Sequence, residues 1–168
     1  MKKLIFFAVC VVFVLFACNK SGVKPQINVS ATIDGVDENF NTTDSLRYSN
    51  TPTVYSASIS ATNGTSATAD KMELMVNNPT QITTGTYTLT KPWNPPFEPL
   101  IIYSTDGGSN YANDYVVDYT GNHPAEITIT SVSNTSIQGT FSGVLVVAAG
   151  TSGATKTITN GKFNLVIK

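Results

Sequence analysis

The stretch EITITSVSNTSIQGTFSGVLVV, residues 126–147, contains the clearest strand pattern in the chain. Apolar and polar residues alternate along each half, as they do in strands that bury one face. Ser133 and Asn134 separate the halves, and both residue types favour turns. The stretch therefore predicts two antiparallel strands joined by a turn.

The run TKTITNGKFNLVIK, residues 155–168, continues this pattern and predicts a return strand. Phe163, Leu165 and Ile167 fall on one face of it. Asn160-Gly161 fits either a tight turn or a bulge. Because strand character continues on both sides of this pair, a bulge or bend is expected.

The same alternation occurs earlier in the chain, at residues 27–33, 54–61, 72–76 and 87–89. Asp34-Gly35 follows the first of these runs and is a hairpin signal. No window has a convincing helical period, since the spaced tyrosines of residues 111–119 lie among β-branched residues and glycines. The prediction is an all-β fold with residues 27–168 as a single domain. It is an antiparallel β-sandwich of about ten short strands, with a partly open β-barrel as the alternative.

The N-terminus has the features of an export signal. Met1, Lys2 and Lys3 precede an apolar run, residues 4–17, that is shorter than the ~20 residues a membrane-spanning helix needs. An uncleaved membrane anchor is the alternative. Leu15-Phe16-Ala17-Cys18 resembles the lipobox of bacterial lipoproteins. This resemblance implies a signal peptide at residues 1–17, acylation of Cys18, and a flexible tether at residues 18–26.

Cysteine and charge content exclude several kinds of chemistry. Cys10 lies in the leader and Cys18 would be capped by lipid, so disulfides, thiolate metal sites and cysteine nucleophiles are not expected. The formal net charge is −1 and no basic stripe is present, so nucleic acid is not an expected partner.

Several strand and turn motifs carry a family resemblance. VSATIDG at residues 29–35, GTYTL at residues 85–89 and the two C-terminal runs resemble small β-rich lipoproteins of Bacteroidota, a group of domains of unknown function. The resemblance implies a lipid-anchored outer-membrane protein and supplies no catalytic residues. In the group that the chain resembles, acidic residues just after the lipidated cysteine often accompany export to the cell surface. Residues 19–22 contain none, so the resemblance implies the periplasmic side rather than the cell surface.

The polar residues give little sign of catalysis or of a cofactor, and neither is expected. His123 is the only histidine and lies in a turn-like sequence, so familiar zinc sites cannot be assembled. Asp106, Asp114 and Asp118 surround a glycine-rich loop and are weak calcium candidates. A hairpin turn explains Asp106-Gly107-Gly108 equally well.

Aromatic residues are the most informative candidates for a binding site. Trp93 and Phe97 lie in the proline-rich run KPWNPPFEPL, which predicts a stiff loop or edge. Together with Tyr103 and Tyr111, they are candidates for stacking on a sugar or contacting a partner. The alternative is a lid in which Trp93 and Phe97 cover one end of the core.

Three function classes follow from these features. The first is a non-catalytic binding or accessory module for a glycan, a peptide or another envelope protein, attached to the membrane through acyl chains on Cys18. The second is a scaffold lipoprotein without a small-molecule ligand, and a hydrolase is the third. Asp44-Ser45-Leu46 also resembles a short bacterial O-glycosylation sequence, which makes Ser45 a modification candidate.

Overall fold

The computed structural model describes residues 26–51, 54–89, 99–149 and 153–166. Within these ranges the chain forms eleven strands and one short 3₁₀ helix, η1 (Tyr111–Asn113), so the all-β prediction is confirmed. The strands are β1 (Gln26–Ile33), β2 (Val36–Phe40), β3 (Thr42–Thr51), β4 (Val54–Thr62), β5 (Lys71–Asn77), β6 (Gly85–Thr88), β7 (Leu100–Ser104), β8 (Asp114–Val117), β9 (Ala125–Val132), β10 (Ser136–Val147) and β11 (Thr155–Val166).

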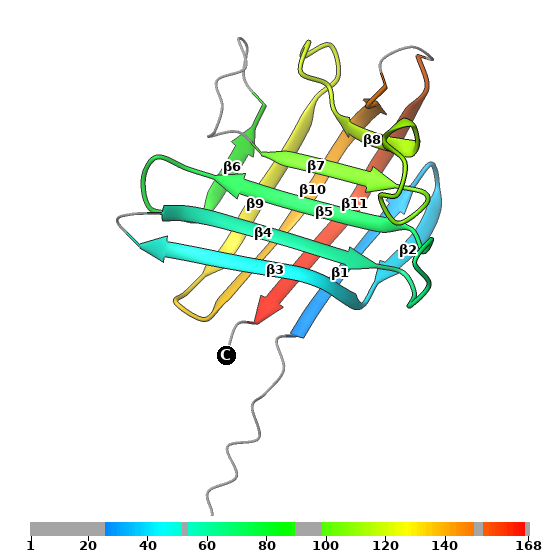
Figure 1. Ribbon diagram of the computed structural model, residues 1–168. Coiled ribbons are helices and arrows are strands. Elements are labelled where there is room, and N and C mark those ends of the chain that lie inside the picture. Colours follow the sequence, from blue (N-terminus) through cyan, green and yellow to red (C-terminus); the bar gives the residue numbers. More distant parts are fainter. Residues whose placement is uncertain (1–25, 52–53, 90–98, 150–152, 167–168) are drawn as a thin grey trace, which may run out of the picture.

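All strand pairs are antiparallel and belong to one continuous sheet with the order β2-β1-β11-β10-β8-β7-β5-β4-β3. The remaining strands, β9 and β6, pair with β10 and β9 respectively. The sheet folds over into two layers, with β3, β4, β5, β7 and β8 in front of the other strands in Figure 1. The architecture therefore combines the two layers of a sandwich with the continuous hydrogen bonding of a partly open barrel.

The two layers are joined at β10. One edge of this strand pairs with β11. The other edge pairs first with β9, from Ile137 to Gly143, and then with β8, from Leu145 to Val147. The long strand that the sequence predicts after the turn at Ser133-Asn134 is therefore the element that links the layers.

The core lies between the layers and follows the period-two alternation of the sequence. In β5, for example, Met72, Leu74 and Val76 are buried while the residues between them are partly exposed. The largest fully buried side chains come from both layers: Phe40, Met72, Ile82, Ile101, Ile127, Ile129, Ile137, Leu145, Ile158 and Leu165.

Two reciprocal glycine–phenylalanine pairs hold β10 against β11. Gly139 lies opposite Phe163, and Phe141 lies opposite Gly161. A Cβ on Gly139 would lie 2.6 Å from the Phe163 ring, and one on Gly161 would lie 2.7 Å from the Phe141 ring. Each glycine therefore leaves the space that the phenylalanine of the neighbouring strand fills.

The predicted turns and bulge are present. Asp34 and Gly35 have φ values of 50° and 86° and connect β1 to β2, as a two-residue hairpin turn requires. Asn160 has a φ of 52°, and the pairing of β11 with both neighbours shifts register near it. The bulge expected at Asn160-Gly161 is therefore confirmed. The β-branched residues among the spaced tyrosines of residues 111–119 favour a strand there. The structure agrees only in part, because Tyr111 belongs to η1 and only Asp114–Val117 forms a strand.

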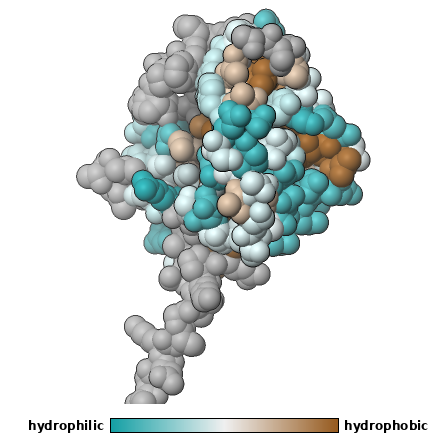
Figure 2. Space-filling view, turned by 45° about the vertical axis from the view of Figure 1, so that its right-hand side comes forward, coloured by the Kyte–Doolittle hydropathy of each residue, from teal (hydrophilic) through white to brown (hydrophobic). Residues whose placement is uncertain are grey.

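The membrane-anchoring prediction concerns residues that the structure does not describe. The proposed signal peptide, Cys18 and nearly all of the tether lie outside the described residues, as do Trp93 and Phe97. Within the described ranges, no helix is long and apolar enough to cross a membrane. The described surface in Figure 2 is largely polar, with apolar residues limited to small separate areas of that face.

The glycine–phenylalanine pairs lead to a stability prediction. Changing Gly139 to Ala should lower the free energy of unfolding by about 1–3 kcal/mol, since the new methyl group would collide with the Thr128 carbonyl oxygen and overpack the Phe163 ring. Gly161→Ala should have a similar effect through Phe141. The measurement is urea unfolding of the purified domain.

Gly64→Ala is the matched control, because a Cβ at Gly64 would make only an ordinary contact with Ala69 at 3.6 Å. Equal stability of the Gly139→Ala and Gly64→Ala variants would contradict the packing explanation.

Candidate functional site

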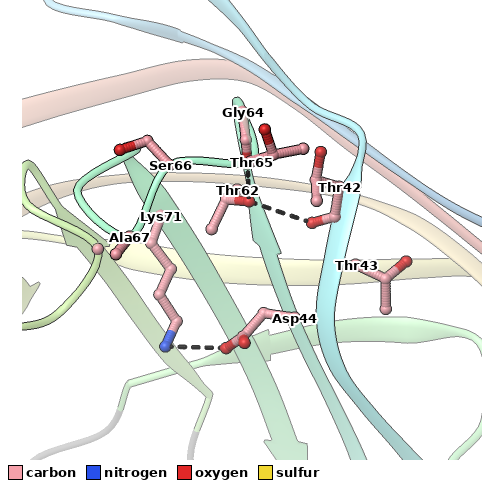
Figure 3. A pocket seen from close by; sticks show the side chains of 10 residues that line it. Thr42, Thr43, Asp44, Thr62, Gly64, Thr65, Ser66, Ala67 and Lys71 are labelled. Atoms are coloured by element: carbon pink, nitrogen blue, oxygen red, sulfur yellow. Dashed lines mark hydrogen bonds and ion pairs between the residues drawn. The ribbon is translucent and has the colours of Figure 1, made fainter.

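A polar pocket of about 340 Å³ lies at one end of the front layer. We call it the polar pocket, and Figure 3 shows its lining residues. Three neighbouring strands contribute to it, together with the loops that follow β4 and β7. The residues are Thr42, Thr43 and Asp44 of β3, Thr62 of β4, Gly64, Thr65, Ser66 and Ala67 of the β4–β5 loop, Lys71 of β5, and Gly107 of the β7–β8 loop.

Asp44 reaches the pocket because of an irregularity in the edge strand β3. The register between β3 and β4 shifts between Thr43 and Ser45, so Asp44 has no direct partner on β4. Such a bulge changes the direction of a side chain relative to regular pairing. The carboxylate of Asp44 consequently lies against side chains of β4 and β5.

An ion cluster forms around Lys71 on the floor of the pocket. Its Nζ lies 2.7 Å from Oε1 of Glu73 and 3.1 Å from Oδ2 of Asp44. The Ser60 hydroxyl donates a hydrogen bond of 3.0 Å to the same Asp44 oxygen. This serine is buried although it belongs to the outer side of the sheet, since the cluster covers it.

The cluster stabilises the charged forms of its members. Hydrogen bonds from Lys71 and Ser60 lower the pKa of Asp44. Burial acts to lower the pKa of Lys71, but hydrogen bonds to Glu73 and Asp44 outweigh it and raise the pKa overall. Both groups therefore stay ionised at neutral pH, which suits hydrogen bonding to a ligand better than proton transfer.

The rest of the lining is rich in hydroxyl groups. The Thr62 hydroxyl donates to the carbonyl oxygen of Gly64 at 2.6 Å and lies 3.5 Å from that of Thr42, which ties the loop to the strands (Figure 3). Thr43 and Thr65 are exposed at the pocket. Hydroxyl groups both donate and accept hydrogen bonds, whereas the Asp44 carboxylate only accepts. The set is suited to a polar ligand with several hydroxyl groups.

Hydrogen bonds and close packing hold the loop that contributes Gly107. Gly107 has a φ of 73°, and a Cβ there would collide with the carbonyl oxygen of Ala67. The Ser104 hydroxyl accepts a hydrogen bond of 2.7 Å from the Gly108 amide, and Asp106 accepts one of 2.8 Å from the Asn113 side chain. Close packing of the two loops therefore defines one wall of the pocket.

Of the predicted aromatic residues, only Tyr103 and Tyr111 are among the described residues, and these two do not share a surface. Tyr103 was a binding candidate, but it is only 5% exposed and belongs to the core. Its hydroxyl donates a hydrogen bond of 2.6 Å to Asp70, and burial together with this carboxylate raises the pKa of Tyr103. It faces inward because it alternates with outward residues in β7 and contacts the ring of Phe40. Tyr111, by contrast, is 64% exposed on η1.

The calcium candidates are also not assembled into a site. Among the described residues, no group of three or more His, Cys, Asp or Glu side chains is placed to hold a metal ion. Asp106 instead caps its own loop by accepting hydrogen bonds from the Gly108 and Ser109 amides. Asp114 opens β8 and Asp118 follows its last residue, so the two carboxylates lie at opposite ends of this strand.

Asp118 organises the β8–β9 loop. It accepts hydrogen bonds from the Thr120 amide and hydroxyl and from the Asn122 amide, at 2.9, 2.6 and 3.2 Å. It also lies 2.7 Å from Nδ1 of His123, whose side chain is 40% exposed. The structure therefore places His123 in a hydrogen-bonded polar turn.

The polar pocket itself was missed at the sequence level. The sequence indicates Asp44 only as part of the possible modification motif around Ser45. The structure places Ser45 in an exposed position on β3. Lys71 and Glu73 do have a recognisable signal, because they alternate with buried residues of β5 and so share its outer face. Their proximity to Asp44 depends on the bulge, which no local motif indicates.

The hydrogen bonds of Asp118 lead to a pH prediction. Burial acts to raise its pKa, but the hydrogen bonds from Thr120 and His123 outweigh this and lower it from 3.8 to about 2. As the pH falls, the unfolded chain is protonated at this residue before the folded protein. The stabilisation from Asp118 should therefore be complete above about pH 5 and lost progressively between about pH 4 and pH 2.

Urea unfolding measured from pH 7 to pH 2 checks this prediction against the Asp118→Asn variant. The variant should be less stable at pH 7 by about 1–3 kcal/mol, and the two proteins should converge at low pH. A constant difference over the whole range would contradict the assignment.

Comparison with known proteins does not assign this fold or this pocket to a family. No protein-family model matches the chain, and neither a curated protein nor a solved structure is similar enough to count as a match. The functional proposal therefore depends on the residues and their geometry.

Proposed function

We propose that this protein is a lipid-anchored, non-catalytic binding module of the bacterial cell envelope that holds a small saccharide in the polar pocket. The observation that carries the proposal is the lining of that pocket, to which two strands and a loop contribute hydroxyl groups together with the Asp44 carboxylate. Sugars present closely spaced hydroxyl groups that both donate and accept hydrogen bonds, which matches this lining.

The size and ionisation of the pocket support binding as its role. Its volume of about 340 Å³ falls in the range of small-molecule sites, ~300–1,000 Å³. Asp44 has a lowered pKa and Lys71 a raised one, so neither is tuned to exchange protons near neutral pH. Lys71 is held by Asp44 and Glu73, which leaves the hydroxyl groups and the carboxylate as the main recognition groups.

A scaffold function is the second candidate, and one feature of the sheet favours it. Among the described strands, β3 ends the strand order and pairs only with β4, at every position except the bulged Asp44. An edge strand of this length can accept an extended segment of another protein by strand addition. Asp44 at the bulge and the exposed Arg47 oppose such pairing, because bulges and charges protect edges.

The anchor in this proposal is the acylated Cys18. The first described strand, β1, begins at Gln26, which pairs with Val166 near the C-terminus. Both ends lie at the lower side of the molecule in Figure 1, away from the loops that follow β8 and β10. An anchor at Cys18 would therefore hold this side nearest the membrane.

The saccharide proposal predicts that removing hydroxyl groups weakens binding without disturbing the fold. Replacing Thr43 and Thr65 by Val preserves their shape, and loss of two hydrogen bonds should reduce affinity roughly tenfold. The measurement is a calorimetric titration of the purified domain with saccharides released from bacterial envelope polysaccharides. Thr140→Val is the control, since Thr140 is an exposed residue of β10 in the other layer.

Saccharides that bind the double variant and the native protein equally would rule out this pocket as the site. Failure of every saccharide to bind the native protein would rule out the ligand class.

The anchor proposal has a separate test in the native host. Incorporation of an alkyne-labelled fatty acid should occur in the native protein and be lost in the Cys18→Ala variant. Label retained by the variant would contradict acylation at Cys18. Detection of the unlabelled variant in the soluble fraction serves as the control for expression.

A further inference from the structure

A second hollow, distinct from the polar pocket, lies on the other layer of the sheet. It has a volume of about 450 Å³, and we call it the β10 groove. Three neighbouring strands of the back layer contribute to it, together with the end of β6. The lining residues are Thr88, Leu89, Pro124, Ala125, Glu126, Ser142, Gly143, Val144, Thr157, Ile158 and Thr159.

The groove forms where β10 changes partners. Pairing with β9 ends at Gly143 and Ala125, and pairing with β8 begins at Leu145 and Val117. Gly143 has no side chain, and a Cβ there would lie 2.9 Å from that of Ala125. Two of the smallest residues are therefore adjacent at the point where β9 and β8 separate, which leaves a depression.

The lining of the β10 groove is mainly hydrocarbon. Leu89, Pro124 and Val144 contribute accessible apolar surface, whereas Ala125 and Ile158 lie buried beneath it. The backbone nearby is internally satisfied, because the Val144 amide donates to the Pro124 carbonyl at 3.0 Å and the Leu89 amide donates to the Ala125 carbonyl at 3.4 Å. The groove therefore favours an apolar group over one that needs hydrogen bonds from the backbone.

Glu126 is the only ionisable side chain among the residues that line the groove. It is exposed, and its Oε1 accepts a long hydrogen bond of 3.5 Å from the Ser142 hydroxyl. Within the described part of the chain, Glu126 forms no ion pair. A negative charge beside an apolar surface attracts a positive charge and repels a negative one. This combination specifies a ligand with one apolar and one cationic part.

We propose that the β10 groove binds small apolar molecules that carry a single ammonium group. The apolar part contacts Val144, Pro124 and Leu89, and the ammonium group pairs with the Glu126 carboxylate. This site is separate from the polar pocket, so its existence does not depend on the saccharide proposal.

Three probes of equal length separate the apolar and electrostatic contributions: hexylammonium, 1-hexanol and hexanoate. Each is titrated into the ¹⁵N-labelled domain at pH 7, and the amide resonances of Ala125, Gly143 and Thr159 are followed by NMR. Hexylammonium should bind about two- to fivefold more tightly than hexanol, as expected for an exposed ion pair. Hexanoate should bind most weakly.

Two variants then test the named residues. Glu126→Gln should make hexylammonium and hexanol equal in affinity, whereas the control Glu38→Gln on β2 should preserve their difference. Val144→Thr keeps the side-chain shape and should weaken all three probes about equally. The proposal is overturned if none of the probes gives saturable shifts at these amides. It is also overturned if the preference for hexylammonium survives in Glu126→Gln.

Discussion

The reciprocal packing of Phe141 and Phe163 against glycines is the constraint on which the rest of the structure depends. Each ring occupies the space that the opposite glycine leaves, so β10 and β11 are locked in one register. Since a one-residue slip would turn every side chain to the other face, this register determines which residues enter the core. Because β10 also pairs with β8 and β9, the same register positions both layers.

Both hollows are consequences of departures from regular pairing in this framework. The polar pocket depends on the bulge at Asp44, which directs a carboxylate toward Lys71. The β10 groove depends on the change of partners near Gly143. The regular parts of the sheet present alternating side chains to solvent, whereas the irregular positions create concave surfaces. A rigid framework with two such surfaces is consistent with the proposed binding function.

The alternation of residues and the turn signals were sufficient to predict most of the fold. The hairpin at Asp34-Gly35 and the bulge at Asn160-Gly161 follow from local backbone preferences, so the sequence reveals them. The site was not predictable in this way. Asp44 and Lys71 are distant in sequence and meet through strand pairing, and the burial of Tyr103 depends on the layer that covers β7. The sequence pattern around an aromatic residue in a strand is the same whether its side chain faces the core or a ligand.

Native-state hydrogen exchange tests the central role of β10 most directly. The amide protons of Phe141 and Leu145 in β10 and of Phe163 in β11 should exchange only through global unfolding, because β10 is paired on both edges and packed by the two rings. Those of the edge strand β3 should exchange through smaller openings with a lower free energy. Exchange of the β10 amides at the same free energy as those of β3 would contradict this account.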